Sequence, residues 1–286
     1  MDELDGRVAI VTGAAQGLGF AIAERFVACG ARVMMADLQS EKIMQAAARI
    51  DPAGRSTAAV IVDVTSAQMV DHMAATANSR FGRVDMLVNV AGGSGRRTVH
   101  AIDQMSDEAW DGIIAANLRG TFLCCRAALP YLRQSADGRI LNFSSGAVQG
   151  VVSKTTISAP LAYAAAKAGI HGFSNQLAKD LETSGVTVNV LQPGFVLTEP
   201  GARVRELFDA LTEAERATML TLLPAAPRQP EEVGFGVAYL MSGATKGITG
   251  MTLRLTGKIT DTKLKIVQEG ASPFGPVARV EPVVAA

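Results

Sequence analysis

Paired cysteines and an excess of charge of either sign are both missing from this 286-residue sequence. Its three cysteines, Cys29, Cys124 and Cys125, form neither a paired framework nor the C-x-x-C spacing of a zinc site. Lys and Arg number 27, as do Asp and Glu, and this balance argues against a protein that binds nucleic-acid phosphates. We therefore expect reduced thiols, no metal and no nucleic-acid partner.

Long apolar runs are missing as well. No run approaches the ~18 residues of a membrane span, and the first six residues, Met-Asp-Glu-Leu-Asp-Gly, lack the basic and apolar regions of a signal peptide. Reduced cysteines are typical of the cytosol, so we expect a cytoplasmic protein without membrane contact. Hydrophobic residues still make up 48% of the chain, which is enough to build a substantial core.

Short β-branched runs alternate with helix-length amphipathic stretches along the chain. We expect strands at 8–11, 32–36, 58–62, 84–88, 139–143, 186–191 and 251–255. This alternation predicts right-handed βαβ units and a doubly wound α/β fold, a seven-stranded, mainly parallel sheet with helices on both faces. Because no linker or repeat divides the chain, residues 1–262 are interpreted as one domain, and residues 263–286 as an extended tail.

A glycine-rich turn follows the first expected strand. It reads Thr12-Gly13-Ala14-Ala15-Gln16-Gly17-Leu18-Gly19 and opens an amphipathic helix. Glycines allow a tight turn and the close approach of a pyrophosphate, which binds the free N–H groups at a helix start. The spacing is G-x-x-x-G-x-G and not the commoner G-x-G-x-x-G. Its place between a strand and a helix nevertheless predicts a dinucleotide site in a Rossmann domain.

Asp37 lies at the end of the second expected strand. A carboxylate there can accept hydrogen bonds from the adenosine ribose and repel a 2′-phosphate. No Arg or Lys follows Asp37 directly, and Gln16 stands where a basic residue could precede Gly17. Both absences favour NAD over NADP, although an ordinary turn aspartate is the alternative. Asp63, at the end of the third strand, could similarly meet the adenine amino group or be a loop residue.

With the motifs downstream, these features resemble the short-chain dehydrogenase/reductase family over about residues 5–257. The turn at 12–19 is similar to the family's cofactor motif. Asn89-Val90-Ala91-Gly92 is similar to its Asn-Asn-Ala-Gly motif, with Val90 departing at the second position. The matching motifs that follow are Ser144-Ser145, Tyr163-x-x-x-Lys167 and Pro193-Gly194-x-x-x-Thr198. Their order and spacing together are specific, whereas each alone is modest.

The resemblance implies an oxidoreductase that transfers hydride between NAD and a secondary alcohol or ketone. The implied catalytic residues are Asn117, Ser145, Tyr163 and Lys167. The implied cofactor contacts are Gly13, Gln16, Gly17, Leu18, Gly19, Asp37, Leu38, Asp63, Val64, Asn89, Ala91, Gly92, Tyr163, Lys167, Pro193, Gly194, Val196 and Thr198. Asn117 would hold a water that links Lys167 to solvent, and its alternative is a helix-kinking side chain. A homotetramer or homodimer, built partly on the helices around 105–134 and 160–183, is also implied.

The Tyr163/Lys167 pair supports this chemistry on physical grounds. Residues four apart on a helix project from one face. A tyrosine with a pKa near 10 is a poor base at neutral pH, but a nearby ammonium and a positive nicotinamide favour its phenolate. Tyr163 could then take the alcohol proton, while Ser145 stabilises charge on the substrate oxygen. A lone pair of this kind is more often a packed ring and a surface lysine; the surrounding motifs favour catalysis.

Three stretches of the sequence bear on the substrate. Residues 195–228 are expected to cover it, with Phe195, Val196 and Leu197 as an apolar wall, and the loop within 146–162 is long for the family. We expect a medium-sized, mainly apolar hydroxy or keto compound; an anionic group held by Arg96 and Arg97 is the alternative. Two other functions stay open: an NADPH-dependent 3-oxoacyl-thioester (acyl-carrier-protein) reductase, against which Asp37 counts, and an NAD-binding protein without turnover.

Overall fold

The computed structural model describes residues 4–94, 102–150, 161–199, 203–223, 226–259 and 263–283. Its strands are β1 (Val8–Thr12), β2 (Arg32–Asp37), β3 (Thr57–Ile61), β4 (Met86–Asn89), β5 (Arg139–Phe143), β6 (Thr187–Gln192), β7 (Thr252–Leu255), β8 (Leu264–Ser272) and β9 (Gly275–Pro282). Its α-helices are α1 (Gly17–Ala28), α2 (Ser40–Ile50), α3 (Ala67–Phe81), α4 (Asp107–Ile114), α5 (Gly120–Leu132), α6 (Leu161–Asp180), α7 (Arg203–Asp209), α8 (Glu213–Leu222) and α9 (Pro230–Met241). Among these residues, no helix combines the length and the apolar character needed to cross a membrane.

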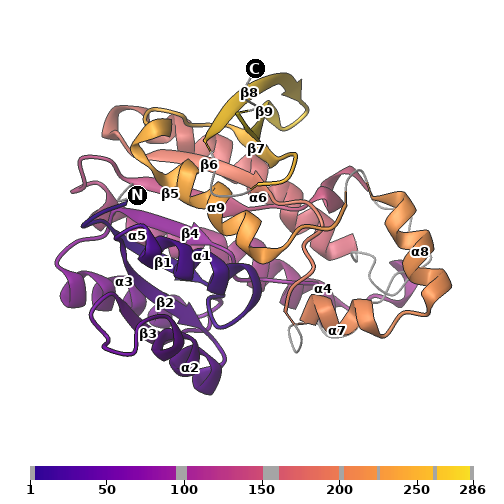
Figure 1. Ribbon diagram of the computed structural model, residues 1–286, viewed down its shortest axis with the longest axis horizontal. Helices are drawn as coiled ribbons and strands as arrows, with labels where there is room; N and C mark the ends of the chain where they lie inside the picture. The colour runs from indigo at the N-terminus through magenta and orange to yellow at the C-terminus, as the bar shows by residue number, and fades with distance from the viewer. Residues whose placement is uncertain are drawn as a thin grey trace.

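The described strands form one sheet with the order β3-β2-β1-β4-β5-β6-β7-β9-β8 (Figure 1). Every neighbouring pair is parallel except β8 and β9. The mainly parallel α/β class expected from the sequence is therefore confirmed. The strand order reverses direction at β1 and β4, and ligands of such sheets bind beyond the carboxyl ends of the strands at this switch point.

Both faces of the sheet are covered by helices, which explains why the strands are apolar on both sides. All five residues of β1 are buried. Val8 and Ile10 belong to a buried cluster with residues of α3 and α5. Ala9 and Val11 belong to the opposite cluster, with residues of α1, α2 and α9. The period of two along the strand thus distributes its side chains between two cores.

Residues 263–283 form a hairpin that extends the sheet, so the expectation of an extended tail after a seven-stranded domain is wrong. Strand β9 pairs parallel to β7, and β8 pairs antiparallel to β9. The hairpin is held because Ala278 and Val280 are fully buried in the core that α1 and α9 also cover. Pro273 lies in the turn and Pro282 at the end of β9, positions where a missing N–H is tolerated.

The tip of this hairpin docks on α6. The Phe274 ring stacks on His171, with 5.0 Å between ring centroids. Asn175 Nδ2 donates a hydrogen bond to the Phe274 carbonyl oxygen at 2.5 Å. Burial, together with nearby Arg254, lowers the pKa of His171 to about 4, so the stacked imidazole is neutral at physiological pH. The end of the chain therefore braces the helix that carries Tyr163 and Lys167.

We expect Phe274→Ala to lower the free energy of unfolding by about 1–3 kcal/mol, because the ring stacking and its apolar contact area are lost together. Urea unfolding at neutral pH measures this change. Val283→Ala is the control, since Val283 lies just after the other end of β9 and its side chain is 45% exposed. Its effect should stay within about 0.5 kcal/mol. A Phe274→Ala protein as stable as the parent would contradict the docking.

Candidate active site

The glycine turn between β1 and α1 is packed too tightly for side chains. Gly13 and Gly17 have positive φ angles of 68° and 59°. A Cβ on Gly19 would overlap the Gly13 carbonyl oxygen, and one on Gly13 would come within 3.0 Å of the Ala91 backbone. The glycines therefore place no side chain of their own over the backbone N–H groups at the start of α1, so that a pyrophosphate can approach them closely. Leu18 packs against the core behind it.

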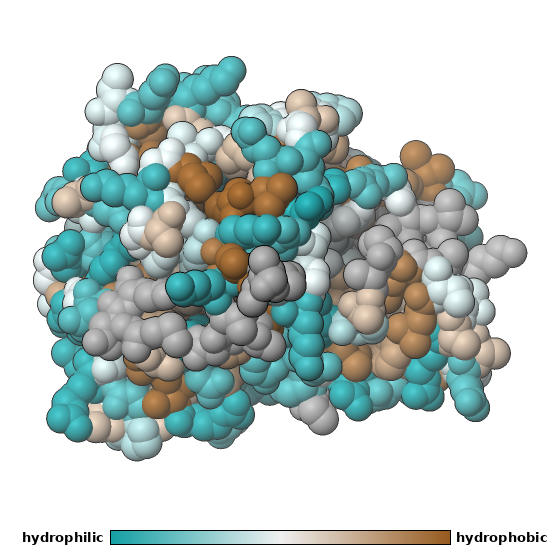
Figure 2. All heavy atoms as spheres, turned by 45° about the horizontal axis from the view of Figure 1, so that its top comes forward, coloured by the Kyte–Doolittle hydropathy of each residue, from teal (hydrophilic) through white to brown (hydrophobic). Residues whose placement is uncertain are grey.

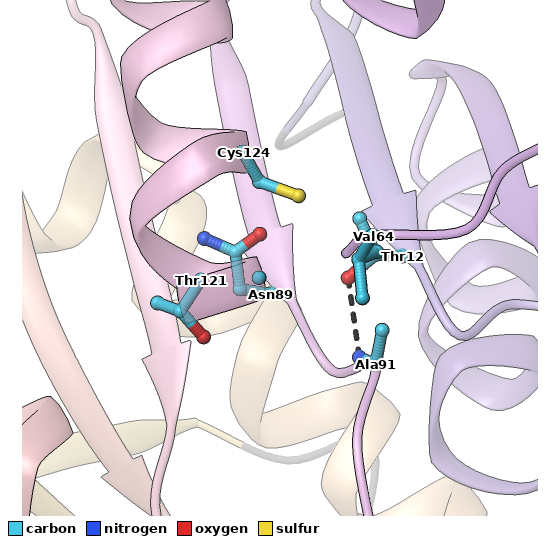
Figure 3. A pocket seen from close by; sticks show the side chains of 7 residues that line it. Thr12, Val64, Asn89, Ala91, Thr121 and Cys124 are labelled. Carbon is cyan, nitrogen blue, oxygen red and sulfur yellow. Dashed lines mark hydrogen bonds between the residues drawn. The ribbon is translucent and has the colours of Figure 1, made fainter. Parts of the chain in front are cut away.

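The ends of β1 and β4 are joined beside this turn. Thr12 Oγ1 accepts hydrogen bonds from the N–H groups of Val90 and Ala91, both at 3.1 Å. Figure 3 shows the bond to Ala91. A small pocket is lined there by Thr12, Val64, Asn89, Ala91, Gly120, Thr121 and Cys124. Asn89 donates to Asn142 Oδ1 at 2.8 Å, whereas its own buried Oδ1 has no hydrogen-bond partner. Three of the expected cofactor contacts, Val64, Asn89 and Ala91, thus come together.

Asp37 lies at the carboxyl end of β2 and supports the glycine turn. Its Oδ2 accepts the Ala15 N–H at 3.1 Å, and its Oδ1 accepts the Gln39 N–H at 3.0 Å. The carboxylate is only half-buried, so it keeps acceptor capacity for ribose hydroxyls. Leu38, directly after it, is 64% exposed. A turn role and a ribose-binding role are therefore compatible in this residue.

Lys42 reaches the same end of the site, although sequence spacing did not single it out. Its Nζ donates a hydrogen bond to Gln16 Oε1 at 3.1 Å. Lys42 lies five positions after Asp37, in α2, so only the packing of α2 beside the glycine turn brings its charge there. An exposed ammonium at this position favours an anionic group nearby.

Asp63 serves the turn between β3 and α3. Its Oδ1 accepts hydrogen bonds from the N–H of Thr65 at 2.9 Å and from the Thr65 hydroxyl at 2.7 Å. These local contacts fit the loop alternative for Asp63. A contact with adenine stays a prediction.

Lys167 lies one helical turn after Tyr163 on α6 and is almost completely buried. Its Nζ donates to the Phe143 carbonyl oxygen at 2.8 Å and lies 5.5 Å from the centroid of the Tyr163 ring. The Ser144 hydroxyl donates to the Lys167 carbonyl oxygen at 3.0 Å. Strand β5 and helix α6 are thereby tied together at the point where the catalytic pair was expected.

Of the two adjacent serines at the end of β5, Ser145 is the one that can reach a ligand. Ser144 is buried, and its hydroxyl is committed to Lys167. Ser145 is partly exposed, and its Oγ accepts the Ala147 N–H at 3.2 Å, which leaves its own proton to donate. The geometry favours Ser145 for binding a substrate oxygen.

Asn117 holds the segment after β4. It lies in a π-helical turn between α4 and α5, Ala115–Arg119, and is fully buried. Its Oδ1 accepts the Gly93 N–H at 3.0 Å, and its Nδ2 donates to the carbonyl oxygens of Gly93 and Ile113 at 2.9 and 2.8 Å. A Cβ on Gly92 would overlap Asn117 Oδ1. The side-chain amide is thus fully used in structure, and the water relay stays a prediction.

Thr198, in the segment that follows β6, lies against the glycine turn. Pro193 and Gly194 form the turn after β6, and Gly194 has a φ of 81°. Thr198 is 7% exposed, and its Oγ1 has no hydrogen-bond partner. A Cβ on Gly17 would lie 3.2 Å from Thr198 Cγ2. An orphaned hydroxyl beside the phosphate-binding turn fits a polar group of a bound dinucleotide.

Arg228, which the sequence did not point to, anchors this side of the site. Val196 and Arg228 form a parallel bridge. The Arg228 guanidinium donates to the carbonyl oxygens of Leu255 and Gly257, both at 2.6 Å, and Arg228 is 6% exposed. The two ends of the segment expected to cover the substrate are therefore fixed to each other and to β7.

Some expected residues lie outside the described part of the chain. These are Arg96, Arg97 and most of the long loop before α6, residues 151–160.

The adjacent cysteines Cys124 and Cys125 are both buried. Burial raises the pKa of both thiols, that of Cys125 to about 12, so they are unreactive. Among the described residues, no group of three or more His, Cys, Asp or Glu side chains is placed to hold a metal ion.

The sequence is similar to those of known proteins. A family model for short chain dehydrogenase matches residues 7–207. The chain belongs to the short-chain dehydrogenase family. It is therefore an oxidoreductase with a Rossmann fold and a site for a nicotinamide cofactor, as the motifs led us to expect. The orphaned Thr198 hydroxyl and the tight glycine-rich turn fit that cofactor.

Three relatives illustrate the range of the family. The short-chain reductase protein NovJ of Streptomyces niveus is 35% identical over 255 residues, which cover 87% of this chain and 92% of NovJ. FabG of Escherichia coli (strain K12), a 3-oxoacyl-[acyl-carrier-protein] reductase, is 35% identical over 254 residues, which cover 88% of this chain and 97% of FabG. BbsD of Thauera aromatica, a (2S)-[(R)-hydroxy(phenyl)methyl]succinyl-CoA dehydrogenase subunit, is 31% identical over 255 residues, with 89% and 96% covered.

Burial lowers the pKa of Lys167 from 10.5 to about 8, because the charged form is desolvated. The charged lysine therefore destabilises the native state below about pH 8, and this penalty shrinks as the pH rises from about 8 towards 10. We expect Lys167→Met to raise the free energy of unfolding of the cofactor-free protein at pH 7 by about 1–3 kcal/mol, less whatever the lost bond to Phe143 contributes.

Thermal unfolding at pH 7 and pH 10 measures this difference, which should be smaller at pH 10. Lys179→Met, on the exposed side of the same helix, is the matched control and should change stability at neither pH. A stabilisation that is equal at both pH values would contradict the role of the buried charge.

Proposed function

We propose that this protein is an NAD(H)-dependent dehydrogenase or reductase that interconverts a secondary alcohol and a ketone, with Tyr163 as the acid/base. The observation that carries the proposal is the buried Lys167 ammonium, fixed by the Phe143 carbonyl and 5.5 Å from the Tyr163 ring. A cation held beside a phenol favours the phenolate. Membership of the family supports oxidoreductase chemistry, and the substrate and NAD are the finer part of the proposal.

The cofactor would lie across the carboxyl ends of the strands. The glycine turn would hold its pyrophosphate, Asp37 its adenosine ribose, and Thr198 the nicotinamide end. When bound, the nicotinamide accepts or supplies the hydride. The protein's own part in alcohol oxidation is to place the substrate hydroxyl between Ser145 and Tyr163. Ser145 donates a hydrogen bond to the substrate oxygen, and Tyr163 Oη takes its proton as the C–H bond is broken. In ketone reduction, Tyr163 returns the proton.

Asp37 supports NAD as the cofactor. A carboxylate at the end of β2 accepts ribose hydroxyl donors, and it would repel the 2′-phosphate of NADP. Its two hydrogen bonds to backbone N–H groups fix its position, so it cannot turn away without loosening the glycine turn.

The second candidate is an NADPH-dependent 3-oxoacyl-thioester reductase. The similarity to FabG supports it, and so does Lys42, whose ammonium lies beside Gln16 near the expected adenosine ribose. The opposing charges of Asp37 and Lys42 make cofactor choice the measurement that separates the two candidates. A cofactor-binding protein without turnover is disfavoured by the complete set of Ser145, Tyr163 and Lys167.

The substrate is proposed to be a medium-sized, mainly apolar hydroxy or keto compound covered by residues 195–228. The bridge between Val196 and Arg228 supports this, because it closes the base of the segment. Phe195 packs against Phe208 of α7, with ring centroids 6.2 Å apart. Apolar side chains gather on the surface that α7 and α8 form (Figure 2), where Leu220 is 40% exposed.

We also propose that the protein acts as a homotetramer or homodimer in the cytoplasm. Large apolar side chains are exposed on the helices expected at the interface. They are Trp110 on α4, Phe122 on α5 and Leu161 on α6, with exposed fractions of 40%, 42% and 43%. Burying them between subunits would remove apolar surface from water.

Tyr163→Phe tests the catalytic assignment. We expect kcat to fall by roughly a thousand-fold or more while the Kd for NAD stays within about two-fold, because the transferable proton is lost with little change of shape. Turnover is followed by the absorbance of reduced nicotinamide on a substrate found by screening secondary alcohols. Tyr131→Phe, on α5, is the control and should keep full kcat. Near-normal turnover by Tyr163→Phe would refute the assignment.

Asp37→Ala tests the cofactor. We expect the ratio of kcat/KM for NAD to that for NADP to fall by roughly ten-fold or more, because ribose hydrogen bonds and phosphate repulsion disappear together. Adding Lys42→Ala to this variant should reduce the use of NADP and leave that of NAD unchanged. A parent enzyme that prefers NADP would contradict NAD and favour the thioester reductase.

A further inference from the structure

We propose that Glu199 is a built-in anion at the phosphate-binding turn: its carboxylate closes the start of α1 in the empty protein and has to leave when a dinucleotide binds. The inference rests on the proposed cofactor site and adds a competing group to it. Glu199 was not among the residues that the motifs identified, because the contact joins positions 182 residues apart.

The contact itself is short and specific. Glu199 Oε1 accepts the N–H of Gly17 at 2.6 Å. Gly17 is the first residue of α1, where unpaired N–H groups and the helix dipole favour negative charge. A carboxylate hydrogen bond to such a group is charge-assisted and stronger than a neutral one.

Helix α1 has no such anion of its own. Gln16, at its N-cap, makes no side-chain hydrogen bond to the helix, and no acidic residue occurs in its first turn. The Gln16 side chain is instead bonded to Lys42. Glu199 therefore supplies the negatively charged acceptor that the residues around the start of α1 do not provide, as a phosphate would.

The position of Glu199 follows from anchored neighbours. The Leu197 N–H donates to the Arg228 carbonyl oxygen, and the Arg228 N–H donates to that of Phe195, both at 2.9 Å. The buried guanidinium of Arg228 ties this bridge to the end of β7. Thr198 lies against Gly17. Glu199 thus comes directly after a fixed base, and α7 and α8 follow it.

The carboxylate and a pyrophosphate compete for the same amide. Two anions at one helix N-terminus repel each other. The single N–H of Gly17 also cannot donate a full hydrogen bond to the carboxylate and to a phosphate at the same time. Binding of the dinucleotide therefore requires the Glu199 contact to break, which weakens the apparent affinity. When the Glu199 hydrogen bond breaks, the glycine turn also loses this connection to the segment that carries α7 and α8. Occupancy of the phosphate site is in this way linked to the cover of the substrate.

Calorimetric titration with ADP-ribose, which carries the pyrophosphate but no nicotinamide, tests this linkage. We expect Glu199→Gln and Glu199→Ala each to lower the Kd for ADP-ribose by roughly three- to ten-fold. Adenosine, used as a competitor without phosphate, should bind the parent and both variants equally. Glu206→Gln, which removes an exposed carboxylate from α7, is the matched control and should leave both values unchanged.

Hydrogen exchange of the empty proteins gives the second measurement. Amides of 203–209 and 213–222 should exchange faster in both Glu199 variants than in the parent or in Glu206→Gln. An unchanged or higher Kd for ADP-ribose in the Glu199 variants would overturn the inference while leaving the cofactor site intact. Failure of the parent to bind ADP-ribose would contradict the cofactor site, and the proposed role of Glu199 with it.

Discussion

The buried ammonium of Lys167 imposes a constraint on which the geometry of the site depends. A charged group removed from water needs a fixed acceptor, and Lys167 finds it in the Phe143 carbonyl at the end of β5. Because β5 lies inside the sheet between β4 and β6, that carbonyl cannot move to suit the helix. The hydrogen bond to Phe143 therefore restricts how α6 can shift or rotate over the sheet. The hydrogen bond from the Ser144 hydroxyl to the Lys167 carbonyl oxygen adds a second restriction. Tyr163 inherits its position from this constraint.

The proposed site combines a floor with a substrate cover, residues 195–228, whose two ends are bridged to each other. The floor consists of α6, the end of β5 and the glycine turn, all tied by backbone groups. The cover begins at the bridge between Val196 and Arg228 and carries α7 and α8. A single arginine, Arg228, donates to the carbonyl oxygens of Leu255 at the end of β7 and of Gly257 just after it, and so sets where this segment starts. On the proposed assignment, different parts of the fold would control chemistry and access.

Local signals predicted most of the fold, and they predicted which residues the end of β5 and α6 bring close together. The strands from β1 to β7 are short runs rich in apolar residues, and the glycine turn and the Tyr163/Lys167 pair depend only on neighbours in sequence. The hairpin was missed because β8 and β9 mix prolines and charged residues with a few buried positions such as Ala278 and Val280. Lys42, Arg228 and Glu199 were missed because their contacts join distant segments, and no spacing rule reports such pairs.

The hairpin has a consequence for the order in which the enzyme matures during synthesis. Asn175 of α6 bonds to the Phe274 carbonyl 99 positions later, and β9 completes the core beside β7 only after β8 has been made. Chains emerge from the ribosome N-terminal end first. The glycine turn and β1 to β6 can therefore assemble while translation continues, but the helix bearing Tyr163 is braced only after the hairpin of residues 264–282 has been made.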